Sequence, residues 1–311
     1  MGKRAFLFPG QGAQAVGMGN ELLACGGPVG DCFAEADQVL GFSLSRLMQE
    51  GPEDQLTLTE NTQPALVTTA MAAFRLIVSR TNWRPDYVAG HSLGEYAAVC
   101  ATGGFAFAEA IALVRLRGQA MQKAVPVGEG AMAAVLNMPA AQVDAICQQV
   151  QKETGGICVT ANYNTPVQIV ISGHEYAVKK AVEMAKSQGA RKSVMLAVSA
   201  PFHCPLMEPA ARQMATAMEK ISFQNLSVPL VSIATGQEVT SGTEVRKLLV
   251  QSITAPVMWE AVIRRMLALG VDMFIEVGTG KVLSGMLKRI DKSLVVYNVS
   301  GPEDLANLPA A

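Results

Sequence analysis

The chain has 311 residues, of which 50% are hydrophobic and 16% are charged. This composition excludes a disordered chain, and the length suits one large domain or two modest ones. With 25 Lys and Arg residues against 26 Asp and Glu residues, the formal net charge is -1, which excludes the broad positive surface of a nucleic-acid-binding or membrane-surface protein.

Neither a targeting segment nor a membrane helix is indicated. The start MGKRAFLFPGQG has only a short apolar run before Pro9, whereas a signal-peptide core needs ~7 to 15 apolar residues. The longest apolar stretch, residues 65–78, is interrupted by Thr68, Thr69 and Arg75 and is shorter than the ~20 residues of a membrane helix. The six cysteines form no Cys-x-x-Cys pair, which favours reduced core thiols over disulfides or zinc. We expect a cytoplasmic protein.

Strand and helix patterns alternate from the N-terminus. Residues 4–8 predict a strand, and the PGQG that closes them predicts a tight turn. Residues 62–82 have a capping Thr62, an early Pro64 and apolar residues at helical spacing, which predicts a buried helix. Residues 87–90 predict a central strand, and residues 93–101 predict the helix after it.

The pattern changes between residues 128 and 199. Strands are predicted at 131–137, 157–163, 167–173 and 191–198, and helices at 139–153 and 175–188. The resulting βαββαβ order predicts a ferredoxin-like unit.

Alternation returns after residue 200, with strands predicted at 228–234, 272–277 and 294–299 and helices after Pro205, through 243–269 and from Lys281. Such alternation implies a parallel sheet covered on both faces. We therefore predict an α/β fold. Residues 1–127 and 200–311 form an α/β-hydrolase-like large domain with a parallel sheet, and residues 128–199 form an inserted ferredoxin-like domain. The seam between them is expected to hold the ligand cleft.

Two glycine-rich stretches resemble nucleotide-binding loops without their key residues. GQGAQA at 10–15 matches the loose dinucleotide pattern, but the segment from Asp31 that should end a second strand in an acidic residue has helical spacing. EVGTGKVL at 276–283 has Ile275 where a phosphate-binding loop needs Gly and Val282 where it needs Ser or Thr. We expect strand-to-helix turns at both stretches.

The stretch GHSLG at residues 90–94 fits the Gly-x-Ser-x-Gly nucleophile elbow, with a strand before it and a helix after it. A serine hydroxyl needs a base to take its proton, and histidine is the usual partner. Of the three histidines, His91 adjoins Ser92 in a tight turn and is expected to pack beside the elbow, and His174 is expected at a surface or helix start. His203 lies where the chain re-enters the large domain, and we predict a dyad of Ser92 and His203.

No carboxylate is an evident third member, because Asp144, Glu153 and Glu183 all lie in helical patterns. A backbone or amide oxygen is therefore expected to orient the histidine. On the helix around residues 109–124, Arg115 shares a face with polar residues and is expected in solvent, whereas Arg117 falls on the apolar side. An inward arginine needs an anion, either a substrate carboxylate or a buried structural acid.

Six motifs carry a family resemblance: FPGQGAQ at 8–14, TENTQPA at 59–65, GHSLGEYAA at 90–98, RLRGQAMQ at 115–122, PFHCPLM at 201–207 and VQSITAPVMWE at 250–260. In this order they resemble the malonyl-CoA:acyl-carrier-protein transacylases of fatty acid synthesis and the related acyltransferase domains of polyketide synthases. The resemblance covers nearly the whole chain.

The resemblance implies roles for the motif residues. Ser92 would carry a malonyl ester and His203 would act as general base and then general acid. The backbone N–H groups of Gln11 and Leu93 would form the oxyanion hole, and Gln251 would orient His203 through an oxygen.

The substrate-binding residues follow in the same way. Arg117 would pair with the malonyl carboxylate, and Gln63 and Asn162 would line the pocket. Phe202 resembles the residue found in malonyl-preferring members. The stretch reads APFH and differs from the Pro-Ser-His of some relatives. The resemblance therefore predicts the selectivity for the acyl group less firmly than it predicts the chemistry of Ser92 and His203.

The implied reaction is a ping-pong transfer from malonyl-CoA, a coenzyme A thioester substrate, to the phosphopantetheine thiol of acyl carrier protein. Neither a metal nor a tightly bound cofactor is expected, and we expect a monomer. Because such carriers are acidic, a local basic patch is expected, with Arg191 and Lys192, or Lys288 and Arg289, as candidates. The alternatives are a serine hydrolase or thioesterase acting on acyl-CoA, and a noncatalytic scaffold that binds the carrier.

Overall fold

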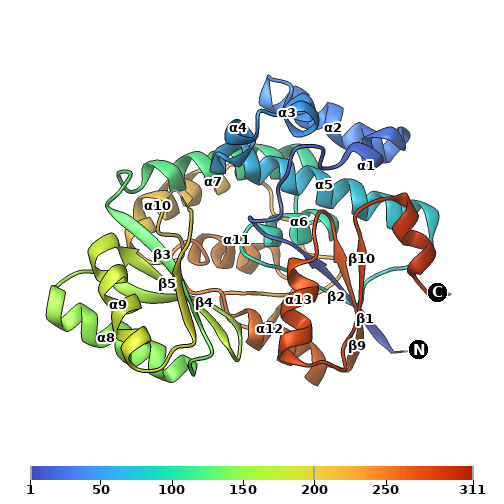
Figure 1. Cartoon of the computed structure of the whole chain (residues 1–311). Coiled ribbons are helices and arrows are strands. Elements are labelled where there is room, and N and C mark those ends of the chain that lie inside the picture. The colour runs from blue at the N-terminus through green and yellow to red at the C-terminus, as the bar shows by residue number, and fades with distance from the viewer. Residues whose placement is uncertain (1, 199, 310–311) are drawn as a thin grey trace.

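The computed structural model describes residues 2–198 and 200–309. The chain forms two sheets that lie side by side, a larger one near both termini and a smaller one at the opposite end of the molecule (Figure 1). Among the described residues, no helix is long and apolar enough to cross a membrane.

The larger sheet has the strand order β10-β9-β1-β2-β7-β8. Its strands are β1 (Lys3–Phe8), β2 (Tyr87–Gly90), β7 (Leu230–Val231), β8 (Glu238–Val239), β9 (Val271–Val277) and β10 (Val295–Val299). The pairs from β10 to β7 are all parallel, which confirms the predicted parallel sheet, and β8 adds an unpredicted antiparallel edge. The segment predicted as one strand over 228–234 is extended in the sheet for only two residues.

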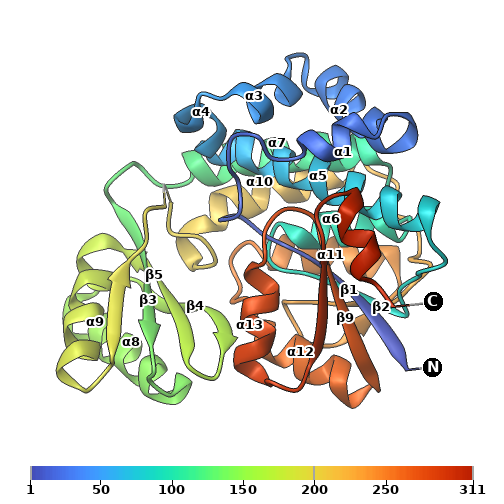
Figure 2. The ribbon, with the colours of Figure 1, turned by 45° about the vertical axis from the view of Figure 1, so that its right-hand side comes forward.

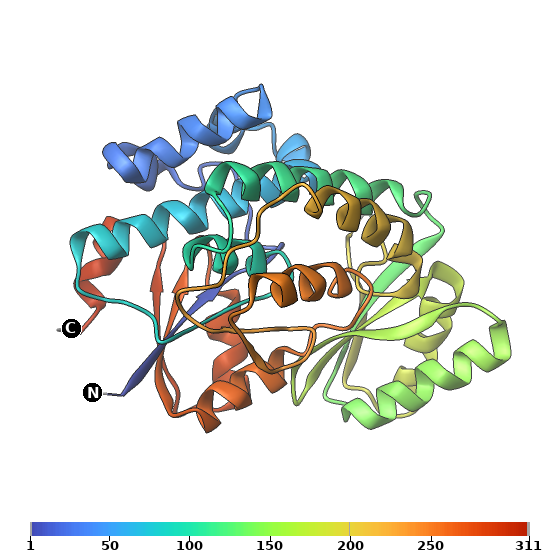
Figure 3. The same cartoon turned by 180° about the vertical axis from the view of Figure 1, so that it is seen from behind.

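Helices cover both faces of this sheet (Figure 3). The helices of this part of the chain are α1 (Asn20–Ala24), α2 (Gly27–Leu40), α3 (Leu44–Glu50), α4 (Glu53–Thr57), α5 (Thr59–Arg80), α6 (Gly94–Ala101), α7 (Phe107–Lys123), α10 (Glu208–Met218), α11 (Gly242–Gln251), α12 (Trp259–Ala268) and α13 (Val282–Ile290), with 3₁₀ turns at Pro205–Met207 and Pro302–Asn307. Of these, α1 to α4 form an outer layer against α5 (Figure 1). The side chains of β1 alternate between the two faces. Phe6 and Phe8 join the core under α5, α6 and α7, whereas Ala5 and Leu7 join the core under α12 and α13.

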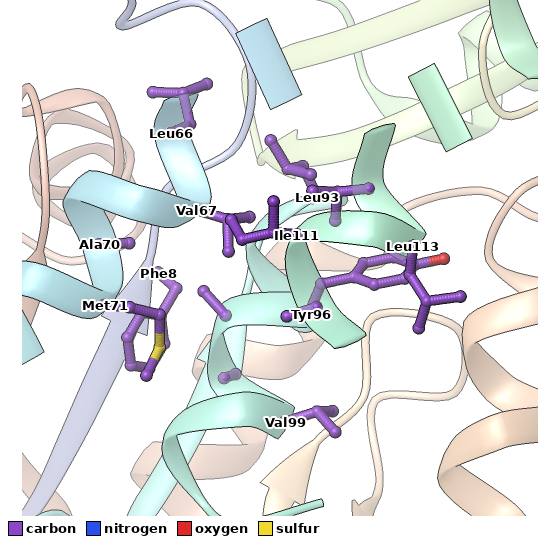
Figure 4. Close-up of a cluster of buried hydrophobic side chains, with 14 of the residues drawn as sticks. Phe8, Leu66, Val67, Ala70, Met71, Leu93, Tyr96, Val99, Ile111 and Leu113 are labelled. Atoms are coloured by element: carbon purple, nitrogen blue, oxygen red, sulfur yellow. The ribbon is translucent and has the colours of Figure 1, made fainter. Parts of the chain in front are cut away.

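The larger core is dense where α5, α6 and α7 meet β1 (Figure 4). Helix α5 begins at Thr59 and not at the predicted cap Thr62, so Pro64 lies inside the helix. Since proline has no N–H, the carbonyl of Glu60 lacks its usual partner four residues on, and it accepts a hydrogen bond from Arg115 Nη1 of α7 at 2.9 Å. A Cβ added to Gly118 of α7 would meet the Cα of Glu60 at 2.6 Å, which shows how closely the two helices pack.

The smaller sheet has the order β4-β5-β3-β6, and its pairs are antiparallel (Figure 2). Its elements in chain order are β3 (Gly130–Leu136), α8 (Ala140–Thr154), β4 (Cys158–Thr165), β5 (Gln168–His174), α9 (Glu175–Ser187) and β6 (Lys192–Met195). This is the predicted βαββαβ ferredoxin-like arrangement. Its two helices cover one face of the sheet, and on the other face Met132, Ala161 and Val170 pack beside Phe202.

Backbone hydrogen bonds join the two sheets at β4. Val257 of the large sheet's side donates to the carbonyl of Ala161 at 2.8 Å and accepts from the N–H of Tyr163 at 2.9 Å. The division of the chain at 127/128 and 199/200 stays a prediction, which the separate sheets and cores support. Residue 199, the predicted end of the inserted domain, lies outside the described residues, as do residues 1, 310 and 311.

Candidate active site

Ser92 lies at the turn between β2 and α6 in a left-handed conformation, with φ of 52°. The flanking glycines allow this turn because the chain passes very close to itself. A Cβ on Gly90 would lie 1.9 Å from the carbonyl carbon of Gly94, and a Cβ on Gly94 would lie 2.0 Å from the carbonyl oxygen of Phe8. The turn therefore has the strained strand-to-helix geometry of a nucleophile elbow.

The hydroxyl of Ser92 meets the imidazole of His203, with 2.7 Å between Oγ and Nε2. The other ring nitrogen, Nδ1, lies 2.7 Å from the backbone carbonyl oxygen of Ser252. Because a carbonyl oxygen only accepts, Nδ1 carries the proton and Nε2 presents its lone pair to the serine. The two groups that sequence reasoning paired across 111 residues are thus set up as nucleophile and base.

The structure corrects the expectation for Gln251. The oxygen that orients His203 belongs to the backbone of Ser252, the next residue, and the Gln251 side chain is exposed and lines a separate groove with Glu219 and Arg246. Gln251 is the last residue of α11, and the carbonyl that His203 meets belongs to the residue directly after it. The lack of an acidic partner for His203 predicted a backbone or amide oxygen, and the oxygen in the structure is a backbone carbonyl.

His203 is 4% exposed. Burial, together with the nearby charge of Arg117, lowers the pKa of His203 to about 3. The predicted helix after Pro205 begins as a 3₁₀ turn and becomes α10 only at Glu208, so burial and not a helix N-terminus keeps the imidazole neutral.

Arg117 points inward, as its helical position predicts, and is 2% exposed. Its Nη2 donates to Ser92 Oγ at 3.1 Å, and its guanidinium lies over the ring of Tyr96, 5.5 Å from the ring centre. Among the described residues, Arg117 forms no ion pair and its Nε has no hydrogen-bond partner. The site therefore holds a buried cation beside the nucleophile, and no carboxylate of the described residues pairs with it.

Arg115 differs from its expected place in solvent. It is partly buried, bonds the carbonyl of Glu60 and the side chain of Asn61, and lies 3.7 Å from the Glu60 carboxylate. Arg115 thus joins α7 to the first turns of α5, where Pro64 leaves a backbone carbonyl without its helical partner.

These groups line one cavity of about 380 Å³ between the two sheets. Gln63, Asn162 and Phe202, the predicted lining residues, border it together with the nucleophile, the base and Arg117. Gln63 is 1% exposed, and its Oε1 has no hydrogen-bond partner among the described residues. The structure also adds Met132 of β3, which sequence reasoning did not single out.

Gln11 and Leu93 border the same cavity as Ser92. Within residues 2–198 and 200–309, their backbone N–H groups donate to no other backbone carbonyl. Leu93 directly precedes α6, so its N–H lies at the positive end of a helix. Both amides are therefore available to an oxygen anion in the cavity.

The two other histidines take the supporting places that sequence reasoning gave them. Nε2 of His91 lies 2.8 Å from Oδ1 of Asn164 on β4, and its ring packs edge-on against Trp259. Nδ1 of His174 accepts from the N–H of Ile157 at 2.8 Å at the start of α9. Asn164 could not be predicted from the sequence, because its partner His91 follows β2 of the other sheet and lies far away in the chain.

The stretch EVGTGKVL is a structural junction. Its Glu276 is fully buried and accepts from the backbone N–H groups of Leu283 and Ser284 and from the side chains of Ser284 and Asn298. The N-terminus of α13 is thus closed by a carboxylate of the chain itself. No group of His, Cys, Asp and Glu residues that could hold a metal occurs in the described part of the chain.

The fold and the site together define an enzyme of acyl transfer through a serine. The chain belongs to the acyl transferase domain family, whose model matches residues 5–301. It is similar to the malonyl CoA-acyl carrier protein transacylases of Bacillus subtilis strain 168, at 43% identity over 98% of this chain and 96% of the relative, and of Escherichia coli K12, at 41% identity over 97% of each.

Solved structures agree with these relatives. The malonyl CoA-acyl carrier protein transacylase of Coxiella burnetii superposes with a TM-score of 0.96 at 39% identity, covering 98% of this chain and 96% of that one. A malonyl-transacylase in complex with its type II polyketide synthase acyl-carrier protein superposes with a TM-score of 0.95 at 39% identity, covering 98% of each.

Proposed function

We propose that this protein transfers a malonyl group from malonyl-CoA to the phosphopantetheine thiol of acyl carrier protein through a malonyl ester on Ser92. The observation that carries the proposal is that Ser92 Oγ lies between the base, 2.7 Å from His203 Nε2, and the inward cation, 3.1 Å from Arg117 Nη2. Together with the family and its malonyl-transferring relatives, this places the protein in the supply of malonyl groups for fatty acid or polyketide chains.

In the first half-reaction, His203 Nε2 takes the proton of Ser92 as Oγ attacks the thioester carbonyl of malonyl-CoA. The carbonyl oxygen becomes an anion that accepts hydrogen bonds from the N–H groups of Gln11 and Leu93. The C–S bond then breaks, and the proton on His203 passes to the leaving thiolate. The products are the malonyl ester of Ser92 and free coenzyme A.

In the second half-reaction the carrier's thiol enters, and His203 takes its proton as the sulfur attacks the ester carbonyl. The C–O bond breaks, and Ser92 recovers its proton from His203. No step needs a metal or a tightly bound cofactor.

Arg117 selects the acyl group in this scheme. Its guanidinium binds the free carboxylate of malonyl, because the described residues that line the cavity include no other Arg and no Lys. Gln63, Asn162 and Phe202 shape the rest of the acyl pocket.

The carrier docks near exposed cations. Arg191 and Lys192 are exposed at the start of β6, whose chain continues into the cavity wall at Leu196. Lys288 and Arg289 are weaker candidates because they already bind the carbonyl of Leu294 and the side chain of Gln168. We also propose a cytoplasmic location, which a malonyl-CoA substrate and a carrier-protein partner support, and a monomeric state.

The test is incubation with malonyl-CoA in the presence and absence of holo acyl carrier protein. We expect malonyl-carrier to form with the carrier, and a malonyl adduct on the protein without it. Rapid release of free malonate with no malonyl-carrier would instead identify a thioesterase. Full transfer by the Ser92→Ala variant would contradict the mechanism and leave only a scaffold role for the elbow.

A further inference from the structure

Arg117 is hydrogen-bonded to the nucleophile itself. Ser92 Oγ donates to His203 Nε2 at 2.7 Å and accepts from Arg117 Nη2 at 3.1 Å. The bond from Arg117 is charge-assisted and lies in a buried site, where such bonds are strong. A cationic donor also draws electron density away from the oxygen that has to attack the acyl carbonyl.

Acylation weakens this hydrogen bond. Before attack, Oγ belongs to a hydroxyl group with two lone pairs that accept hydrogen bonds. After attack it is an ester oxygen that shares a lone pair with the new carbonyl group, and such an oxygen is a weak acceptor. The bond from Arg117 to Ser92 is therefore stronger in the resting site than in the acyl-enzyme, and an interaction of this kind slows the chemical step.

Little else in the described chain holds the Arg117 guanidinium. It forms no ion pair there, its Nε has no hydrogen-bond partner, and its other contact is the ring of Tyr96, 5.5 Å away. Arg115, two residues earlier, binds both the carbonyl and the carboxylate of Glu60. A carboxylate is a stronger acceptor than a hydroxyl and matches the guanidinium fork, so a carboxylate in the cavity draws Arg117 away from Ser92.

A malonyl group brings such a carboxylate to this position. One CH2 group separates its carboxylate from the carbonyl carbon that Ser92 attacks, and Ser92 and Arg117 line the same cavity of about 380 Å³. An acetyl group presents the same carbonyl carbon but brings no carboxylate. The two donors therefore differ in whether the bond from Arg117 to Ser92 is replaced by another before the serine attacks.

We propose that Arg117 restrains Ser92 in the resting site, and that a carboxylate bound to Arg117 releases the serine for attack. The cavity then has two separable positions, one for the acyl carbonyl at Ser92 and one for a carboxylate at Arg117, and a small free carboxylate such as formate fills the second. This inference rests on the proposed malonyl transfer and adds that Arg117 governs the rate of attack as well as binding. The release exchanges hydrogen bonds only, and no covalent bond changes until Ser92 attacks.

The consequence is that formate has opposite effects on the two donors. With acetyl-CoA, formate on Arg117 frees Ser92, and acylation is expected to be about tenfold faster at saturating formate, the effect of losing one charge-assisted hydrogen bond from the ground state. With malonyl-CoA, formate competes with the substrate's own carboxylate for the same cation. The kcat/KM for malonyl-CoA is therefore expected to fall as the formate concentration rises.

The experiment measures coenzyme A release in single turnovers with each donor, from zero to about 100 mM sodium formate, with sodium chloride keeping the ionic strength constant. We expect faster acetylation and slower malonylation in the wild-type protein, and neither effect in Arg117→Ala. The matched control is Arg115→Ala, which removes an arginine of the same helix that binds Glu60 and should show both effects. If Arg117→Ala does not fold, the opposite signs with the two donors in the wild type decide.

A second readout needs neither donor. An uncharged sulfonyl fluoride reacts with Ser92 by forming an O–S bond and breaking the S–F bond, while the serine proton leaves through His203 and fluoride is released. Formate is expected to speed this inactivation in the wild type and to leave it unchanged in Arg117→Ala.

Three results would overturn the inference while leaving malonyl transfer intact. Slower malonylation without faster acetylation would show that formate reaches Arg117 but releases nothing. No effect of formate on either donor would remove the separate carboxylate position, and faster acetylation that persists in Arg117→Ala would assign the effect to another group. Absence of any malonyl-enzyme in the wild type would instead remove the proposed function, and the sulfonyl fluoride would still test the restraint on Ser92.

Discussion

Replacing Arg117 with alanine is the sharpest test of how the acyl group is chosen. Arg117 is 2% exposed and lines the cavity beside Ser92, so the loss of its guanidinium leaves a malonyl carboxylate there without its cationic partner. Removing one member of a buried ion pair costs about 3 to 5 kcal/mol, which corresponds to a loss of about 150- to 4,000-fold in kcat/KM.

Acetyl-CoA has no carboxylate and should lose less than about fivefold in kcat/KM, because no buried ion pair is broken. It could even gain, since Arg117 lowers the pKa of His203 and its removal makes that base stronger. The assay compares single-turnover acylation by both donors in Arg117→Ala and Arg117→Lys, where lysine keeps the charge without the fork and should be intermediate.

Arg115→Ala is the matched control, because Arg115 lies on the same helix but binds Glu60 and not the cavity. It should lower stability while keeping the wild-type preference for malonyl over acetyl. Equal losses with both donors in Arg117→Ala would show that Arg117 is a structural residue and refute the reasoning.

Three further predictions concern the dyad and the elbow. Ser92→Ala should reduce transfer by at least about 10⁴-fold and show no malonyl adduct by intact-protein mass. Because the pKa of His203 is lowered to about 3, kcat/KM for acetyl-CoA should stay level from pH 7.5 to pH 5.5, and a fall of about tenfold, as for a histidine of ordinary pKa, would contradict the burial argument. Gly94→Ala, whose Cβ would lie 2.0 Å from the Phe8 oxygen, should cost more than about 4 kcal/mol in the free energy of unfolding, measured by urea denaturation, and a near-wild-type midpoint would show that the elbow can relax.

The sequence predicted the fold wherever patterns were long. The two alternating α/β segments and the βαββαβ unit between them have strong periodicities, and the structure confirms them. The sequence-based prediction was wrong where an element is short or where its boundary depends on contacts with residues far away in the chain. Strand β8 spans two residues, and α5 begins before Thr62 because Arg115 satisfies the carbonyl that Pro64 leaves unpaired.

The residues of the site also fall into those that the sequence predicted and those that only the structure shows. Ser92, His203 and Arg117 were found because each depends on residue type in a recognisable local pattern. The family resemblance assigned the partner of His203 to Gln251. Reasoning from the residues predicted a backbone or amide oxygen but could not name it, because every residue has the same backbone carbonyl, and the structure shows that of Ser252. Met132 was overlooked because its place at the cavity depends on how the two sheets lie against each other, which no local pattern shows.

The carbonyl of Ser252 has an evolutionary consequence. In an enzyme where an aspartate orients the histidine, a single codon change removes the orienting group. Here every amino acid placed at position 252 would still supply the oxygen, provided that the end of α11 keeps its path. Selection at this position should therefore act on the size and backbone preference of the residue, since Ser252 is 1% exposed, and a saturation library should tolerate small residues there while rejecting bulky ones.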